Sequence, residues 1–263
     1  MRVAAFFPRL QATLQALSPT HLASRKRASV AALFRHAPGP NPRLQLLFIR
    51  RCVNPSDTWS GHIAFPGGRT QPSEMDLDSA SRETREEIGL DLDRDGFRLV
   101  GQLHDRPVHY GTTVVASFVF QHDGRTPFKM TLEPSEVADA VWVDVAYLAS
   151  APIQSLEIPV EMIFPWLTTY PSLLARLQES TFFKSIGFPC IYLPRPTEED
   201  DVVDATTPRQ ANDFVLWGLT YTMVSDLFVA GGLDALPMTS RSLRYARSFL
   251  FHWRRRQQRS VAK

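Results

Sequence analysis

The stretch that decides the fold spans residues 68–90 and has the sequence GRTQPSEMDLDSASRETREEIGL. Its polar residues and glycines stand at set intervals: Gly68, Glu74, Arg82, Glu83, Glu86, Glu87 and Gly89. A chance arrangement of so many polar residues and glycines is improbable. The pattern therefore favours a helix that carries chemistry over the ordinary alternative, a solvated acidic surface helix.

The apolar residues of this stretch predict a helix over residues 77–88. A core-facing stripe recurs at helical spacing and consists of Leu77, Ala80, Thr84 and Ile88. The Thr84 hydroxyl is expected to bond to a carbonyl one turn back. At about 100° per residue, the glutamates fall together on an adjacent arc. Gly89 then stands where a helix favours a left-handed residue at its end.

The three helix glutamates, Glu83, Glu86 and Glu87, form a cluster of like charge. Such charges one turn apart destabilise a helix. Arg82 can offset only part of the repulsion, through a pair with Glu86 four residues later. A hard divalent cation with oxygen ligands would remove the rest. The cluster therefore predicts a metal site.

With FPGG at 65–68 leading in, the stretch resembles the Nudix box, the signature of hydrolases that cleave a nucleoside diphosphate linked to another moiety. The resemblance implies an α/β fold, the Nudix α/β/α sandwich with a mixed sheet, here with a C-terminal helical extension. It also implies a pyrophosphohydrolase (diphosphatase) that uses Mg²⁺ or Mn²⁺. The family prefers an aliphatic residue where this chain has Thr84.

The resemblance implies roles for individual residues. The metal ligands would be Glu83, Glu87, Glu86 and the carbonyl of Gly67, and the candidate catalytic residues are Glu86, Glu74, Arg82 and Glu136. Arg82 would orient the glutamates. A base must take a proton from the attacking water, and Glu86, Glu133 or Glu136 could do so. Glu136 could equally be a loop or capping residue. The candidate substrate-binding residues are Arg50, Gly67, Gly68 and Trp59.

Substrate choice is expected to lie outside the box. LLFIRR at 46–51, GHIAFPGG at 61–68 and LWGLT at 216–220 resemble the coenzyme A-type subgroup, whose products would be 3′,5′-ADP and 4′-phosphopantetheine. DTWSGH at 57–62 departs from the subgroup's motif. The alternatives are an ADP-ribose or dinucleotide hydrolase, an RNA-cap hydrolase that uses the basic chain ends, and a non-catalytic nucleotide-binding module. Such modules usually lose a helix glutamate, and all three are present here.

Four parts are expected along the chain: an N-terminal helix or arm over 1–27, a Nudix hydrolase domain over 28–150, an extension packed on it over 151–230, and a basic C-terminal helix or tail over 231–263. Strands are predicted at 28–34, 44–50, 62–65, 97–103, 112–121, 137–143 and 190–193. Further helices are predicted at 8–17, 144–149 and 212–228. Four prolines should break any long element between 151 and 188.

Charge is segregated along the 263 residues although the net charge is only +2. Residues 1–56 hold nine Lys or Arg and no acid, residues 241–263 hold eight and no acid, and the middle therefore carries −15. The basic ends could bind phosphate, nucleic acid or membrane, or could fold back on the acidic middle. We expect a small nucleoside diphosphate derivative as the partner, with nucleic acid unlikely and a homodimer possible.

Compartment is indicated by two further features. Cys52 and Cys190 are far apart in sequence and form no disulfide framework, so buried, inert thiols in a reducing compartment are expected. No transmembrane segment is expected, because the apolar run at 214–230 is short and carries Asp226. The first residues are free of acid and bear Arg, as in mitochondrial presequences. Cytoplasmic localisation is expected, with mitochondrial as the alternative.

Overall fold

The computed structural model describes residues 5–54, 60–108, 113–180, 183–194 and 214–238. Trp59, residues 195–213 and the basic tail beyond 238 lie outside these ranges. The chain divides into two compact units. One comprises residues 1–151 with 192–236, and the other 152–191 with 237–263. The extension predicted over 151–230 is thus shared between the two units.

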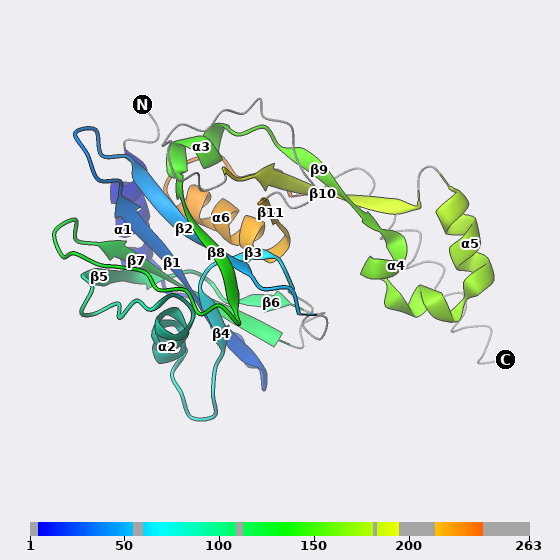
Figure 1. Ribbon diagram of the computed structural model, residues 1–263, viewed down its shortest axis with the longest axis horizontal. Helices are drawn as coiled ribbons and strands as arrows, with labels where there is room; N and C mark the ends of the chain where they lie inside the picture. The colour runs from blue at the N-terminus through cyan, green and yellow to red at the C-terminus, as the bar shows by residue number, and fades with distance from the viewer. Residues whose placement is uncertain (1–4, 55–59, 109–112, 181–182, 195–213, 239–263) are drawn as a thin grey trace. The chain divides into compact units, whose positions relative to one another are not determined.

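The first unit is built on a mixed sheet (Figure 1). Its strands are β1 (Arg27–His36), β2 (Leu44–Arg51), β3 (Ile63–Ala64), β4 (Gly67–Arg69), β5 (Phe97–Gln102), β6 (Arg106–Val108), β7 (Thr113–His122) and β8 (Val137–Asp144). The main order is β3-β2-β1-β7-β5, with β8 on β2, β4 on β1 and β6 on β7. The β1–β7 pair is parallel, and the other pairs, including β1–β2, β2–β8 and β5–β7, are antiparallel.

Successive side chains of β1 point to opposite faces of the sheet, so this strand contributes apolar side chains to both faces. Helices cover both faces. Ala31 and Leu33 belong to the core that includes Ala80 of α2 (Asp76–Ile88). Phe34 lies on the other face, with its ring 6.1 Å from that of Phe6 in α1 (Phe6–Ala16). The Phe6 ring also contacts Phe228 of α6 (Gly218–Ala230), while the short α3 (Val145–Ser150) follows β8. The predicted α/β sandwich is confirmed.

The central helix α2 forms as its sequence predicts. Ala80, Thr84 and Ile88 are fully buried, and Leu77 packs against the same core. The Thr84 hydroxyl donates to the Ala80 carbonyl at 2.7 Å, so this buried polar group has a hydrogen-bond partner. An aliphatic residue at this position would have no hydroxyl to satisfy. The helix ends at Gly89, whose φ of 71° is left-handed and whose N–H donates to Arg85 O.

The helix predicted over 212–228 was placed too early. Residues 215–217 form the short strand β11 (Val215–Trp217), and α6 begins only at Gly218. Gly218 has a φ of 64°, a left-handed conformation that separates strand from helix. Within α6, the otherwise anomalous Asp226 forms a bidentate ion pair with Arg106 of β6. No helix in the described ranges has the length and apolar character that a membrane span requires.

The second unit has a small core of its own. Strands β9 (Gln154–Pro159) and β10 (Ser185–Tyr192) pair antiparallel, and β10 starts earlier than the predicted 190–193. Between them lie α4 (Val160–Ile163), the 3-10 helix η3 (Pro165–Thr169) and α5 (Pro171–Glu179). The buried core residues are Val160, Leu167, Leu177 and Ile186. Prolines keep these elements short, and Pro171 occupies the helix start that proline tolerates best.

Candidate active site

Two adjacent glycines, Gly67 and Gly68, line the loop in front of α2. Gly67 has a φ of 151°, and a Cβ there would stand 2.2 Å from the Ser29 carbonyl oxygen of the neighbouring strand. At Gly68 a Cβ would instead meet the Glu83 carboxyl group at 2.5 Å. The first glycine is therefore required by the backbone of β1, and the second makes room for a helix carboxylate.

Glu87 is the most deeply buried of the helix glutamates, with 1% of its side chain exposed. Its Oε2 accepts the Gly67 N–H at 2.8 Å, and its Oε1 lies 3.2 Å from Nη1 of Arg51. Burial raises the pKa of Glu87 to about 7, although the Gly67 N–H and the Arg51 charge act in the opposite direction. The two partners thus offset only part of the cost of burying this carboxylate.

Arg82 joins the remaining carboxylates into one network. Its Nε donates to Glu74 Oε1 at 2.8 Å, and its Nη1 donates to Glu83 at 2.9 Å and to Glu86 at 2.8 Å. Its Nη2 bonds to the other Glu74 oxygen and to the Arg69 carbonyl. These bonds lower the pKa of Glu74. Arg82 therefore orients the glutamates, and Glu74 attaches the preceding loop to the helix.

The three helix glutamates are not equivalent. Glu83 is 14% exposed, and burial raises its pKa as it does for Glu87, whereas the side chain of Glu86 is 54% exposed. After burial, the charge of Glu83 also raises the pKa of Glu87, and the charge of Glu86 raises the pKa of Glu83. Paired carboxylates of this kind fit a hard divalent cation. Within the described ranges, however, no three Asp, Glu, His or Cys side chains already converge as a formed ligand set.

The loop between β7 and β8 brings two further glutamates towards the helix end. The N–H of Glu133 donates to the Glu87 carbonyl at 2.9 Å, and the N–H of Cys52 donates to the Glu136 carbonyl at 2.8 Å. The side chain of Glu133 accepts two bonds from Ser135, which lower its pKa. Glu136 is exposed. Burial is the largest cause of the raised pKa values of Glu87 and Glu83, and the charge of Glu136 is a smaller cause of both. Glu136 is therefore close enough to act on this pair.

The two arginines at the end of β2 point to different surroundings. The Arg50 guanidinium lies 5.8 Å from the centre of the ring of Phe214, the residue before β11. Arg51 reaches Glu87 instead, and the sequence prediction had not included it. Adjacent side chains of a strand point to opposite faces of the sheet, so Arg50 and Arg51 are expected on different faces. Which of the two faces α2 depends on the register of β2 with its neighbouring strands. The predicted substrate-binding residue Trp59 lies outside the described residues.

A second set of contacts, also absent from the sequence prediction, holds the start of α2. Arg27 bonds to Asp76 through Nε at 3.1 Å and to the fully buried carboxyl of Asp105 through Nη2 at 2.8 Å. The Thr70 hydroxyl donates to the same Asp76 at 3.3 Å. Both ends of the loop and helix are thus fixed to the sheet. The thiol of Cys52 is only half-buried and bonds to the Pro134 carbonyl, whereas Cys190 is buried as expected.

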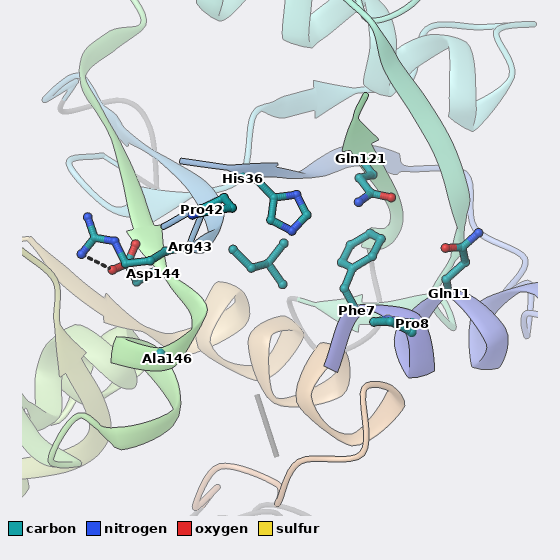
Figure 2. Close-up of a pocket in the computed structure, with 10 residues that line it drawn as sticks. Phe7, Pro8, Gln11, His36, Pro42, Arg43, Gln121, Asp144 and Ala146 are labelled. Carbon is teal, nitrogen blue, oxygen red and sulfur yellow. Dashed lines mark ion pairs between the residues drawn. The ribbon is translucent and has the colours of Figure 1, made fainter. Parts of the chain in front are cut away.

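A groove of about 520 Å³ opens elsewhere in the first unit (Figure 2). Its lining includes His36 at the end of β1, Phe7 of α1 and the Arg43–Asp144 ion pair. Gly67 pairs with Val30, six residues before His36 on the same strand. At 3.3 Å per residue this is roughly 20 Å. The groove is therefore separate from the glutamate site.

Comparison with known proteins agrees with this architecture. A family model described as the NUDIX domain matches residues 25–165, more than half of the chain. The chain therefore belongs to the NUDIX domain family, and its fold is that of a Nudix-type hydrolase. An uncharacterized protein of Schizosaccharomyces pombe is 30% identical over 192 residues, which cover 70% of this chain and 55% of that protein. The chain thus spans about half the length of this curated relative.

Solved structures of the family are more distant. A Nudix hydrolase from M. smegmatis is 16% identical, with a TM-score of 0.36, over 59% of this chain and 89% of its own. An Ap4A hydrolase complex from C. elegans is 17% identical, with a TM-score of 0.36, over 57% and 98%. The MutT protein of Methanosarcina mazei is 19% identical, with a TM-score of 0.37, over 61% and 100%. Likeness at this level supports no statement about substrate.

Proposed function

We propose that this protein is a Mg²⁺- or Mn²⁺-dependent hydrolase that cleaves the diphosphate bond of a nucleoside diphosphate derivative. The observation that carries the proposal is the buried carboxylate of Glu87 next to the partly buried carboxylate of Glu83, beside a glycine loop. Carboxylates shielded from water without full compensation are costly unless a cation joins them. Gly68 leaves the Glu83 carboxyl accessible on the loop side, since no Cβ covers it.

Glu83 and Glu87 would hold the cation, with Glu86 and the Gly67 carbonyl as further donors. When bound, a divalent cation neutralises charge on the diphosphate and lowers the pKa of water. Arg82 keeps Glu83 in position through its 2.9 Å bond. The exposed Glu136 is the better base for the attacking water, because the Glu133 carboxylate is already occupied by Ser135.

Coenzyme A is the first candidate substrate, on the basis of the LWGLT segment at 216–220. The hydroxyl of Thr220 donates to the Ile63 carbonyl at 3.0 Å, which fixes the start of α6 to β3. Trp217 of the same segment contacts His62 at 4.9 Å between ring centres. His62 immediately precedes β3, the strand that leads into the glycine loop, and a pair of aromatic rings there would suit the planar base of a nucleotide. ADP-ribose, dinucleotides and capped RNA are the alternative substrates, and the names of the relatives described above do not point to coenzyme A.

The proposal is tested with a panel of coenzyme A, ADP-ribose, a dinucleoside polyphosphate and capped RNA, each with Mg²⁺ or Mn²⁺ and with products identified by mass. Glu83→Gln and Glu87→Gln keep the side-chain volume and remove the ligand charge. We expect each to lower turnover on the order of 10³-fold, as the loss of a key electrostatic group does. Asp93→Asn, an exposed residue beyond the helix, is the control for one lost charge. Near-normal turnover in Glu87→Gln would refute the metal site.

A further inference from the structure

The two partners of Glu87 differ in their freedom to move. The Gly67 N–H belongs to β4, whose backbone pairs with β1, and the space around Gly67 is closed by Ser29 and Val30. Arg51 approaches with a long side chain that is 27% exposed. A ligand arriving at Glu87 can therefore displace Arg51, whereas the bond to Gly67 must stay. The carboxylate has one permanent partner and one exchangeable partner.

The end of β2 places Arg51 at the rim of the site. The register of β2 with β8 shifts after Arg50, which pairs with Asp139, so that Arg51 pairs with Val137 and Ala138 is the extra residue. Bulges of this kind redirect side chains beside active sites. The next residue, Cys52, bonds to the Glu136 backbone. Arg51 thus contacts the buried carboxylate, and the residue after it is bonded to the backbone of the exposed Glu136.

We propose that Arg51 is the counter-ion of Glu87 in the metal-free protein, that it would give up this carboxylate when a divalent cation is bound at the glutamates, and that its guanidinium would then bind the substrate's diphosphate. The inference rests on the proposed function. A buried carboxylate needs a compensating positive charge, and either the Arg51 guanidinium or a bound divalent cation would supply it. A guanidinium also matches phosphate oxygens through two parallel N–H groups.

This exchange predicts opposite effects on two ligands when Arg51 is removed. Metal binding should become tighter, because the cation no longer has to displace a competitor. Substrate binding should become weaker, because a phosphate contact is lost. If Arg51 only supported the local structure, its removal would misplace Glu87. Metal and substrate would then both bind more weakly.

The test is a Mn²⁺ titration of the metal-free protein, followed by electron paramagnetic resonance at about pH 8, where carboxylates are ionised. For Arg51→Gln we expect Mn²⁺ binding about 10-fold tighter than wild type, a usual size for coupled binding. KM for the substrate that the panel identifies should rise about 10-fold, as for one lost charge-assisted hydrogen bond. Arg43→Gln removes the same charge beyond the opposite end of β2 and should leave Mn²⁺ affinity unchanged.

Equal or weaker Mn²⁺ binding by Arg51→Gln would overturn the inference while leaving the proposed function intact. A wild-type protein that binds no Mn²⁺ would overturn both. Arg51→Lys keeps the positive charge, so it serves if the glutamine variant does not fold. We expect its Mn²⁺ affinity to exceed that of wild type by a smaller factor, because an ammonium lacks the fork of the guanidinium. Weaker binding by this variant would also count against the exchange.

Discussion

At the scale of single residues, Gly67 and Gly68 are adjacent and yet constrained by different neighbours. The backbone of β1 crowds Gly67, and its φ of 151° is one that other residues rarely adopt. The far end of a flexible side chain, Glu83, crowds Gly68. The first constraint concerns the fold, and the second concerns the position of a carboxylate. Substituting each glycine separates these two effects.

Gly67→Ala should lower the free energy of unfolding by more than about 3 kcal/mol, since backbone strain and a backbone clash coincide. Gly68→Ala should cost no more than about 1 kcal/mol, because the Glu83 side chain can move aside. The same movement should weaken Mn²⁺ binding by about 10-fold, or about 1.4 kcal/mol. Urea unfolding and Mn²⁺ titration measure the two effects. A Gly68→Ala protein with unchanged Mn²⁺ affinity would show that Glu83 is no ligand.

Glu87 makes the stability of the metal-free protein depend on pH. Its pKa rises from 4.5 to about 7 on folding, so the folded state binds more protons than the unfolded state between these values. Stability from this group is therefore highest below about pH 4.5 and falls as the pH rises to about 7. Glu87→Gln does not titrate, and its advantage over wild type should grow across this interval to at most about 3 kcal/mol. Urea unfolding in chelator would measure the difference, and a constant difference across this range would contradict the assignment.

At the scale of elements, the loop at 69–74 and helix α2 are joined through Arg82. One guanidinium bonds to Glu74, Glu83, Glu86 and the Arg69 carbonyl. Its own side chain is 17% exposed and that of Glu74 is 15% exposed, so these contacts are largely shielded from water. Removal of the arginine would leave three carboxylates facing one another without a counter-charge.

Arg82→Leu should therefore lower the free energy of unfolding by about 2–3 kcal/mol, more than an exposed ion pair would contribute. Arg85→Leu, an exposed change on the same helix, should stay within about 0.5 kcal/mol. The double variant that combines Arg82→Leu with Glu74→Gln should lose less free energy of unfolding than the sum of the two single losses, because Arg82 and Glu74 share one contact. Additive costs in urea unfolding would show that the network is not a unit.

The same elements show what the sequence could and could not predict. Helix α2 was predicted to within one residue at its start, because Leu77, Ala80, Thr84 and Ile88 repeat at the helical period and Gly89 marks its end. The start of α6 was not predicted, because the apolar residues around Trp217 suit a strand and a helix equally. Only the left-handed Gly218 separates the two elements.

The carboxylate site was predicted by residue type, while its internal order was not. The spacing of Glu83, Glu86 and Glu87 predicted one cluster, but their unequal burial depends on how α2 lies against β1 and β4. The choice of Arg51 over Arg50 depends on strand register and on the bulge at Ala138. Such long-range pairing leaves no local signal in the sequence. Trp59 stays a prediction, since it lies outside the described residues.

At the scale of the whole molecule, the segregated charge of the sequence could act on an anionic substrate in two different ways. The acidic middle of the chain concentrates cations, and the basic ends could attract anions directly. These two arrangements predict different responses to salt. The residues beyond 238 lie outside the described structure, and their sequence carries eight basic residues and no acid.

Deletion of residues 240–263 removes eight basic groups and changes the formal net charge from +2 to −6. We expect kcat/KM for a small diphosphate substrate to stay within a few-fold of wild type, with modest dependence on salt, because the cations proposed at the helix glutamates would already meet the phosphates. If the tail steers an anionic partner, association should instead slow by about 10-fold at low ionic strength and converge with wild type at high salt. Steady-state kinetics at several salt concentrations separates these outcomes. A large, salt-sensitive fall in kcat/KM on the small substrate would assign the tail a part in substrate capture.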